Sequence, residues 1–195
     1  MANLWYVMGK SAAGKDHVYQ ELQKRIPSLK PLITYTTRPL RLGEQQGREY
    51  HFTDEAQISA FEKEGKVIEK RVYQTLHGPW TYATVDDGSF SPEGEVSAVA
   101  IGTLESFEKL KNYFGADHVI PIYLEATDRE RLRRAIHRED DQEKPNMSEV
   151  CRRYLADEQD FSEEKLKAAG ITKRYWNMDL ERCLEEITAD VVNYA

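Results

Sequence analysis

A glycine-rich loop stands directly after the first apolar segment of the chain. Residues 3–8 (NLWYVM) are apolar nearly throughout, as in a short buried strand. Residues 9–15 (GKSAAGK) match the pattern G-x-x-x-x-G-K, and an apolar helical period follows until Pro27. Such a loop points several N–H groups and a helix N-terminus at one anion. The order strand, loop, helix therefore predicts a phosphate site in an α/β fold.

Two positions of this loop carry side-chain chemistry. Lys15 is the lysine that reaches the β- and γ-phosphates in loops of this pattern. The next residue is normally Ser or Thr, whose hydroxyl binds Mg²⁺, but here it is Asp16. A carboxylate can bind a hard cation directly or through water. It can also simply favour the helix N-terminus, so both interpretations of Asp16 stay open.

Strand-like and helix-like segments alternate along much of the chain. The apolar segments at 96–101 and 119–124 each precede a helical pattern, which is typical of a parallel sheet with crossover helices. Residues 34–88 instead hold several strand signals and one clear helix, which predicts an inserted lobe of mainly antiparallel type. The polar residues 137–147 predict an exposed segment between two helices. Further strands are expected at 32–35, 49–52 and 67–76, and helices after Asp54, Thr103, Thr127, Asn146 and Asp179.

The amino-acid composition argues against several classes of protein. The chain has 27 basic and 34 acidic residues and a net charge of −7, so it lacks the general basic footprint of a nucleic-acid binder. The two cysteines, Cys151 and Cys183, have no spacing typical of zinc sites or disulfide frameworks. No apolar run is long enough to span a membrane. We therefore expect a cytoplasmic protein with no nucleic-acid and no membrane partner.

Side chains suited to a phosphorylated ligand gather in the predicted lobe. Arg38 and Arg41 offer forked donors beside several hydroxyls, and Tyr50 adds a phenol. Glu69 offers a carboxylate that can accept two hydrogen bonds from a guanine-type N–H edge. Arginines in a turn are also ordinary surface residues. The residues alone leave both interpretations open.

Four sequence blocks occur in order along the chain, and together they resemble the guanylate kinase family. They are GKSAAGK at 9–15, TTR-x-x-R-x-GE at 36–44, G-x-x-Y-x-F at 47–52 and EKEGKVIE at 62–69. The resemblance implies a P-loop NTPase core with a parallel sheet flanked by helices, an inserted mainly β NMP-binding lobe and a small helical lid. The implied boundaries are 1–33 and 89–195 for the core, 34–88 for the lobe and 137–150 for the lid.

The resemblance also implies an activity, namely ATP-dependent phosphoryl transfer to GMP giving GDP and ADP. ATP and GMP would be the small-molecule partners, Mg²⁺ would accompany ATP, and the chain would be a monomer or a homodimer. Two alternatives are weighed. One is a related kinase of another phosphorylated acceptor, such as ribose 1,5-bisphosphate. The other is a non-catalytic binding module of the same architecture.

Site residues follow from the resemblance position by position. Those implied to bind ATP are Gly9, Lys10, Ser11, Ala12, Ala13, Gly14, Lys15, Asp16 and Asn177. Those implied to bind GMP are Thr34, Arg38, Arg41, Tyr50, Glu69, Tyr82 and Thr84. The implied catalytic cations are Lys15, Arg134, Arg138 and Arg153. Arg134 and Arg138 are four residues apart, so both can face one cleft, although a solvated helix face would have the same pattern.

The strand at 96–101 departs from the family pattern. The family's aspartates at the end of this strand assist Mg²⁺ and read guanine, but here the strand runs into Gly102 without a carboxylate. Asp16 is therefore a candidate metal ligand, and Glu44 is another, acting through water. The missing aspartate and Asp16 motivate the alternative acceptor named above.

Overall fold

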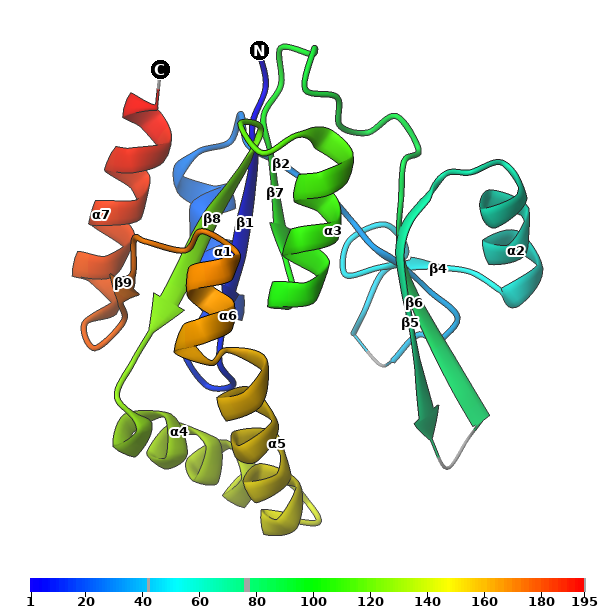
Figure 1. The fold of residues 1–195 in the computed structure, drawn as a ribbon. Helices are drawn as coiled ribbons and strands as arrows, with labels where there is room; N and C mark the ends of the chain where they lie inside the picture. The colour runs from blue at the N-terminus through cyan, green and yellow to red at the C-terminus, as the bar shows by residue number, and fades with distance from the viewer. Residues whose placement is uncertain (42, 76–77, 195) are drawn as a thin grey trace.

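A five-stranded parallel sheet forms the centre of the molecule (Figure 1). The structure, a computed structural model, describes residues 1–41, 43–75 and 78–194. The strand order is β2-β7-β1-β8-β9, and each neighbouring pair runs parallel. The strands are β1 (Leu4–Gly9), β2 (Lys30–Pro31), β7 (Ala98–Ile101), β8 (Val119–Glu125) and β9 (Tyr175–Trp176). The expected α/β core with a parallel sheet is confirmed.

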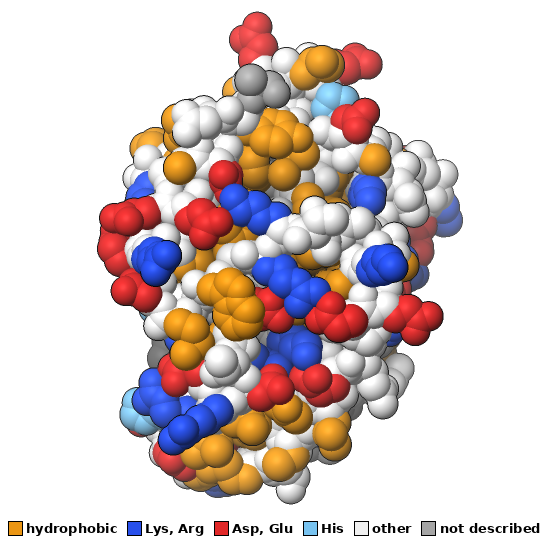
Figure 2. Space-filling view, turned by 60° about the vertical axis from the view of Figure 1, so that its left-hand side comes forward, with side chains coloured by type: hydrophobic (Ala, Val, Ile, Leu, Met, Phe, Trp, Pro, Cys, Tyr) orange, Lys and Arg blue, Asp and Glu red, His pale blue; other side chains and the backbone are white. Residues whose placement is uncertain are grey.

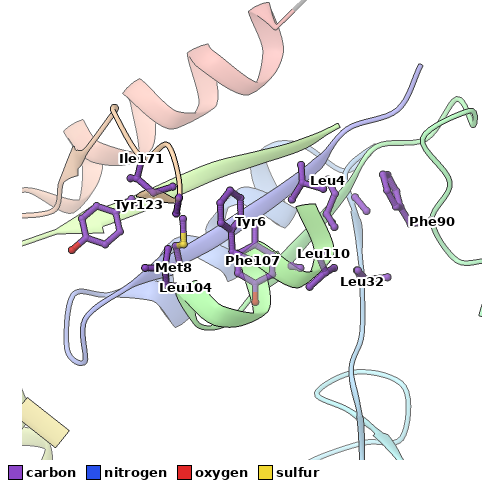
Figure 3. Packing of buried hydrophobic residues seen from close by; sticks show 14 of the residues in the cluster. Leu4, Tyr6, Met8, Leu32, Phe90, Leu104, Phe107, Leu110, Tyr123 and Ile171 are labelled. Carbon is purple, nitrogen blue, oxygen red and sulfur yellow. The ribbon is translucent and has the colours of Figure 1, made fainter. Parts of the chain in front are cut away.

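Helices cover both faces of this sheet because β1 is buried on both faces. Tyr6 and Met8 belong to one apolar cluster, and Figure 3 shows them beside Phe107 of α3. Trp5 and Val7 point to the opposite face and pack in a second cluster. The first face is covered by α3 (Leu104–Phe114) and α6 (Glu163–Ala168), the second by α1 (Lys15–Arg25) and α7 (Leu180–Asn193).

The lobe between β2 and β7 forms a second sheet of order β4-β3-β6-β5. Its pairs β3–β6 and β5–β6 are antiparallel and its short pair β3–β4 is parallel, so the mainly antiparallel lobe is confirmed. Ile58 of the lobe helix packs on this sheet. The elements are β3 (Tyr35–Thr36), β4 (His51–Phe52), α2 (Glu55–Lys63), β5 (Val67–Thr75) and β6 (Gly78–Val85). Leu42, within the second sequence block, and Leu76, the expected end of β5, lie outside the described residues.

Two further helices, α4 (Asp128–Asp140) and α5 (Met147–Asp160), lie beyond the end of β8 (Figure 1). The expectation that 137–147 is an exposed segment between helices is wrong for its first part, because α4 continues to Asp140. Its Arg and Glu residues are good helix formers, so a polar composition does not end the helix. The connection between the helices covers only 141–146.

Local capping signals located the helices well. The five expected capping side chains each accept a hydrogen bond from a first-turn N–H, namely those of Asp54, Thr103, Thr127, Asn146 and Asp179. The strand expected at 32–35 is wrong. The chain there leaves the central sheet after Pro31 and joins the lobe sheet at Tyr35, so one apolar run serves two sheets. The sequence did not reveal α6 or the two-residue strand β9.

Acidic and basic side chains lie interspersed on the face seen in Figure 2. Charged side chains of α4 and α5 also form ion pairs within one helix turn, such as Arg133 with Glu130 and Arg152 with Glu149. In the described part of the chain no helix has the length and apolar character needed to cross a membrane.

Candidate active site

The glycine loop connects β1 to α1 through an unusual backbone. Ala12 and Gly14 both have positive φ, 60° and 97°, which turns the loop sharply before the helix. A Cβ on Gly14 would lie 2.2 Å from Nδ2 of Asn177, so only glycine fits. Lys15 then folds back over the loop, and its Nζ donates to the carbonyls of Gly9 at 2.8 Å and Lys10 at 3.1 Å. The Lys15 ammonium is thus fixed against the loop by hydrogen bonds to two of its carbonyl oxygens.

Burial lowers the pKa of the Lys15 ammonium, and the carboxylates of Asp157 and Asp16 oppose this shift. Asp157 also accepts a hydrogen bond from the Ser11 N–H at 2.7 Å. A carboxylate on a loop N–H group shows that this part of the loop binds negatively charged oxygen. A phosphate chain offers the same kind of oxygen.

The predicted catalytic cations share one cleft of about 560 Å³ with the loop. Lys15, Arg134, Arg138 and Arg153 all line it. Arg134 is held by Glu130 and by the Asn177 carbonyl, both at 2.8–2.9 Å. Arg138 is exposed and acts electrostatically on Lys15. The structure therefore brings these four residues together from α1, α4 and α5.

A buried arginine that the sequence analysis did not single out connects the glycine loop to α5. The side chain of Arg131 is 3% exposed and donates to the Ser11 carbonyl at 3.1 Å. It also donates to Asp157 and Glu158 of α5, each at 3.2 Å, while Lys10 contacts Glu158 at 2.7 Å. No local pattern in the sequence separates Arg131 from its exposed neighbours. Only the docking of α5 on α4 distinguishes it.

Asn177 lies against the loop backbone. Its side chain is buried, and Nδ2 donates to the Ala13 carbonyl at 2.8 Å. Its Oδ1 is buried and has no hydrogen-bond partner among the described residues. Asn177 and Leu180 line the same cleft as Lys15. A contact of Asn177 with a nucleotide stays a prediction, since Nδ2 already binds the Ala13 carbonyl and Oδ1 is buried.

The second half of the site lies in the lobe, where Arg38 is buried and preoriented. Its guanidinium binds the Glu44 carboxylate through two hydrogen bonds of 3.0 and 2.8 Å. It also lies 5.3 Å from the ring centre of Tyr50, and the hydroxyl of Tyr82 acts on it as a hydrogen-bond partner. Glu44 raises the pKa of Arg38, and Arg38 lowers the pKa of Glu44. These contacts place the Arg38 guanidinium beside the side chains of Tyr50 and Tyr82.

A cleft of about 640 Å³ runs along this side, lined by Thr34 and Tyr50. Asp16 lines both this cleft and the one beside Lys15, so it stands at their junction. The Arg41 side chain is exposed, while its backbone N–H donates to the Glu44 carboxylate and its carbonyl accepts from the Glu44 N–H. The structure thus brings Thr34 and Tyr50 to the cleft but leaves the Arg41 side chain on the surface.

Glu69 and Thr84 lie buried at the base of the lobe sheet. The Thr84 hydroxyl donates to Glu69 Oε1 at 3.0 Å across the paired strands β5 and β6. The same carboxylate binds Arg71 at 3.1 Å, a residue that the sequence analysis did not single out. The signal available for Arg71 was its position two residues after Glu69, which puts both on one face of a strand.

The two candidate metal ligands differ. Asp16 is exposed at the junction of the clefts, and a single carboxylate beside phosphate oxygens suits Mg²⁺, which keeps most of its other ligands as water. Glu44 already accepts two hydrogen bonds from Arg38 and one from the Arg41 N–H, so its role as a metal ligand through water stays a prediction. Within the described residues no group of three or more acidic, His or Cys side chains could hold a metal alone.

Comparisons with known proteins agree on one family. The family model described as Guanylate kinase matches residues 1–164. The guanylate kinase of Coxiella burnetii is 38% identical over 78 residues, which cover 40% of this chain and 38% of that protein. The guanylate kinase of Chromobacterium violaceum is 33% identical over 92 residues, covering 45% of this chain and 44% of that protein. The chain thus spans about two fifths of the length of these relatives.

A solved structure gives the same fold. The crystal structure of guanylate kinase from Anaplasma phagocytophilum aligns with a TM-score of 0.59 over 98% of this chain and 84% of that chain. The sequence identity is 18%, so this likeness concerns the fold. It extends beyond the segments in which the sequence matches are found.

Proposed function

Because the chain belongs to the guanylate kinase family, we propose that it transfers the γ-phosphoryl group of ATP to GMP, giving ADP and GDP. One observation carries the proposal. Lys15, Arg138 and Arg153 line a cleft beside the glycine loop, and Asp16 joins that cleft to a second one lined by Tyr50. A cationic donor site that opens onto an acceptor site is what direct transfer between two phosphorylated substrates needs.

In the proposed reaction an oxygen of the GMP phosphate attacks the γ-phosphorus of ATP in line with the leaving oxygen. One O–P bond forms, and the bond from γ-phosphorus to the bridging oxygen breaks, its electron pair leaving with ADP. The attacking phosphate oxygen is already anionic, so no protein base is required. Lys15 and the lid arginines would stabilise the negative charge spread over the transferring group.

Mg²⁺ would accompany ATP, with Asp16 as the residue of this chain placed to hold it. When bound, the ion would shield the charge of the phosphate oxygens. Asp16 would also orient those oxygens toward the junction of the clefts.

Acceptor binding and closure of the site would fall to two different segments of the chain. The lobe 34–88 would bind GMP through Arg38, Tyr50 and Tyr82, and 137–150 would serve as a lid. Closure of lobe and lid over the cleft would exclude water and so suppress hydrolysis of ATP. The hydrogen bond from the buried Arg131 to the Ser11 carbonyl supports this division, because it connects α4, from which the segment 137–150 continues, to the phosphate site.

A coupled assay of ADP release tests the proposal. The chain would be given ATP and Mg²⁺ with GMP, dGMP, AMP, CMP, UMP or ribose 1,5-bisphosphate, and a reaction without acceptor would measure hydrolysis. We expect GMP to be turned over at roughly 1–100 per second, the usual range of kinases. Turnover with ribose 1,5-bisphosphate but not GMP would overturn the acceptor. ATP binding without any turnover would favour a non-catalytic binding module.

A further inference from the structure

Arg71 and Glu69 form an ion pair on one face of the lobe sheet. Arg71 Nε lies 3.1 Å from Glu69 Oε2, and Arg71 Nη2 lies 3.3 Å from Oε1. The Glu69 side chain is 1% exposed and that of Arg71 is 22% exposed. In the register of β5 and β6, Glu69 is opposite Thr84 and Arg71 is opposite Tyr82. Arg71 therefore shares a sheet face with the residues proposed to bind the acceptor.

The end of β7 cannot supply the carboxylate that is missing there. A Cβ on Gly102 would lie 2.1 Å from the Tyr6 hydroxyl, so no side chain fits at this position. Strand β5, which carries the pair, contacts α3, whose N-cap residue Thr103 directly follows Gly102. Recognition of a base at this end of the cleft is thus left to side chains of the lobe.

The Glu69–Arg71 pair retains hydrogen-bonding capacity. A guanidinium has five N–H donors, and Glu69 uses one on Nε and one on Nη2. In the described part of the chain, Arg71 Nη1 has no hydrogen-bond partner. A carboxylate has about four lone-pair sites, so Glu69 can still accept from a ligand after binding Arg71 and Thr84.

These donors and acceptors have the order of a guanine edge. Guanine presents the acceptor O6 beside the donor N1–H. The pair presents an Arg71 donor beside the one acceptor site that Glu69 keeps after two hydrogen bonds from Arg71 and one from Thr84. We propose that Arg71 is a specificity-determining residue that donates to O6 of the base whose N1–H group donates to Glu69. Adenine reverses the first two groups of this edge, so its amino group would face the Arg71 donor and be rejected. The inference rests on the proposed function, with GMP as acceptor.

The same pair disfavours a second phosphate as the ligand. Glu69 offsets the charge of Arg71, and its buried carboxylate would repel a phosphate placed beside it. Arginine paired with the O6 side of guanine is in contrast a common contact in base recognition. The Glu69–Arg71 pair therefore favours a neutral base edge over an anion.

Steady-state kinetics of Arg71→Met and Arg71→Lys test this inference. Lys70→Met is the matched control, because Lys70 precedes Arg71 on β5, faces the other side and pairs with Glu62. The acceptors are GMP, AMP and 6-thioguanosine monophosphate, which keeps N1–H but has a weak acceptor in place of O6. We expect Arg71→Met to lower kcat/KM for GMP by about 10- to 100-fold, mainly through KM, because one hydrogen bond to a charged group is lost.

For the thio analogue the same substitution should change kcat/KM by less than about threefold, since its sulfur already lacks most of that bond. Arg71→Lys should recover part of the GMP activity, and KM for ATP should stay unchanged in all variants. Lys70→Met should match the unsubstituted chain within about twofold, as surface substitutions usually do.

Equal losses for GMP and its thio analogue would overturn the role of Arg71. Loss of activity in Arg71→Lys equal to that in Arg71→Met would do the same, and this variant keeps a cation beside Glu69 should Arg71→Met fail to fold. Retained turnover of GMP by the unsubstituted chain marks these as failures of the inference alone. Absence of GMP turnover by the unsubstituted chain would overturn the proposed function and the inference with it.

Discussion

The two clefts that meet at Asp16 bind charge in different ways. On the loop side the site is built from backbone N–H groups and from Lys15, whose ammonium is held by two carbonyl oxygens. On the lobe side each buried or half-buried arginine already binds a carboxylate, Arg38 with Glu44 and Arg71 with Glu69. Arg134 and Arg153 on the loop side also pair with Glu130 and Glu149, so the difference lies in Lys15, which is held by carbonyl oxygens, while both arginines of the lobe side are oriented and largely neutralised by an acid.

This difference fits the two proposed substrates. A triphosphate carries most of the charge, and a site of N–H groups around an ammonium held by carbonyl oxygens attracts it with little demand on base or sugar. A monophosphate must be distinguished by its base, so fixed donors and acceptors matter more than charge. Pairing each arginine with an acid fixes its geometry, although it reduces the net attraction for phosphate. The comparison predicts that substitutions on the loop side affect rate most, and those on the lobe side affect acceptor affinity.

The largest effect is expected from Lys15→Ala. Lys15 is the cation held over the loop, and its loss removes charge that would stabilise the transferring phosphoryl group. Turnover in the ADP-release assay should fall by about 10²- to 10³-fold or more. Lys165→Ala is the control, because Lys165 is an exposed lysine of α6 that pairs with Asp160 and lines neither cleft. Activity of Lys15→Ala near that of Lys165→Ala would contradict a donor site at the loop.

Arg131→Met should reduce stability most among the arginines of α4. The substitution leaves Asp157 and Glu158 without their buried partner. Breaking a buried ion pair typically costs 3–5 kcal/mol, and partial exposure of Glu158 reduces this to about 2–3 kcal/mol. Urea unfolding would measure it, with Arg133→Met as the control. Arg133 is exposed, so its substitution should stay within about 0.5 kcal/mol. Equal urea midpoints for the two variants would show that the ion pairs of Arg131 do not stabilise the packing of α4 against α5.

The same contrast explains how far the sequence could lead. The loop side was predictable because its motif is contiguous and its geometry follows from glycine positions and a helix N-terminus, as Gly14 and Lys15 illustrate. The helix starts were predictable because a cap is a contact over three residues. Residues that act by pairing across elements were not. Arg131 pairs with α5, 26 residues away, and no local pattern encodes that contact.

Departures from local expectation had similar causes. The apolar run at 32–35 looked like one strand, yet the chain changes sheets there, and only the tertiary arrangement decides that. Glu44 was considered only as a candidate metal ligand, but in the structure Arg38 donates a hydrogen bond to each of its oxygens. A carboxylate six residues from an arginine gives no sign of being its partner until the turn between them is known.

Glu44→Gln should weaken acceptor binding with a smaller effect. Glu44 orients Arg38 through two hydrogen bonds, and an amide would keep at most one of them. We expect KM for GMP to rise by about 3- to 10-fold, corresponding to roughly 1 kcal/mol, while kcat and KM for ATP change little. Glu62→Gln, at an exposed glutamate of the same lobe, serves as the control. A fall in kcat with unchanged KM would instead place Glu44 on the loop side of the comparison.

The smallest effect is expected at the junction itself, from Asp16→Asn. Asp16 is exposed and lines both clefts, so its carboxylate can contribute to binding of Mg²⁺ beside the phosphates, which supply most of the ligand charge. The Mg²⁺ concentration for half-maximal rate should rise by about 3- to 10-fold, since one anionic ligand is replaced by a neutral amide. Glu21→Gln on the same helix should leave that concentration unchanged, because Glu21 pairs with Lys24 and lines neither cleft itself. If Asp16→Asn altered stability but not the Mg²⁺ requirement, the carboxylate would serve only the helix N-terminus, an effect of about 0.3–1 kcal/mol. The two clefts would then meet at a residue without a role in transfer.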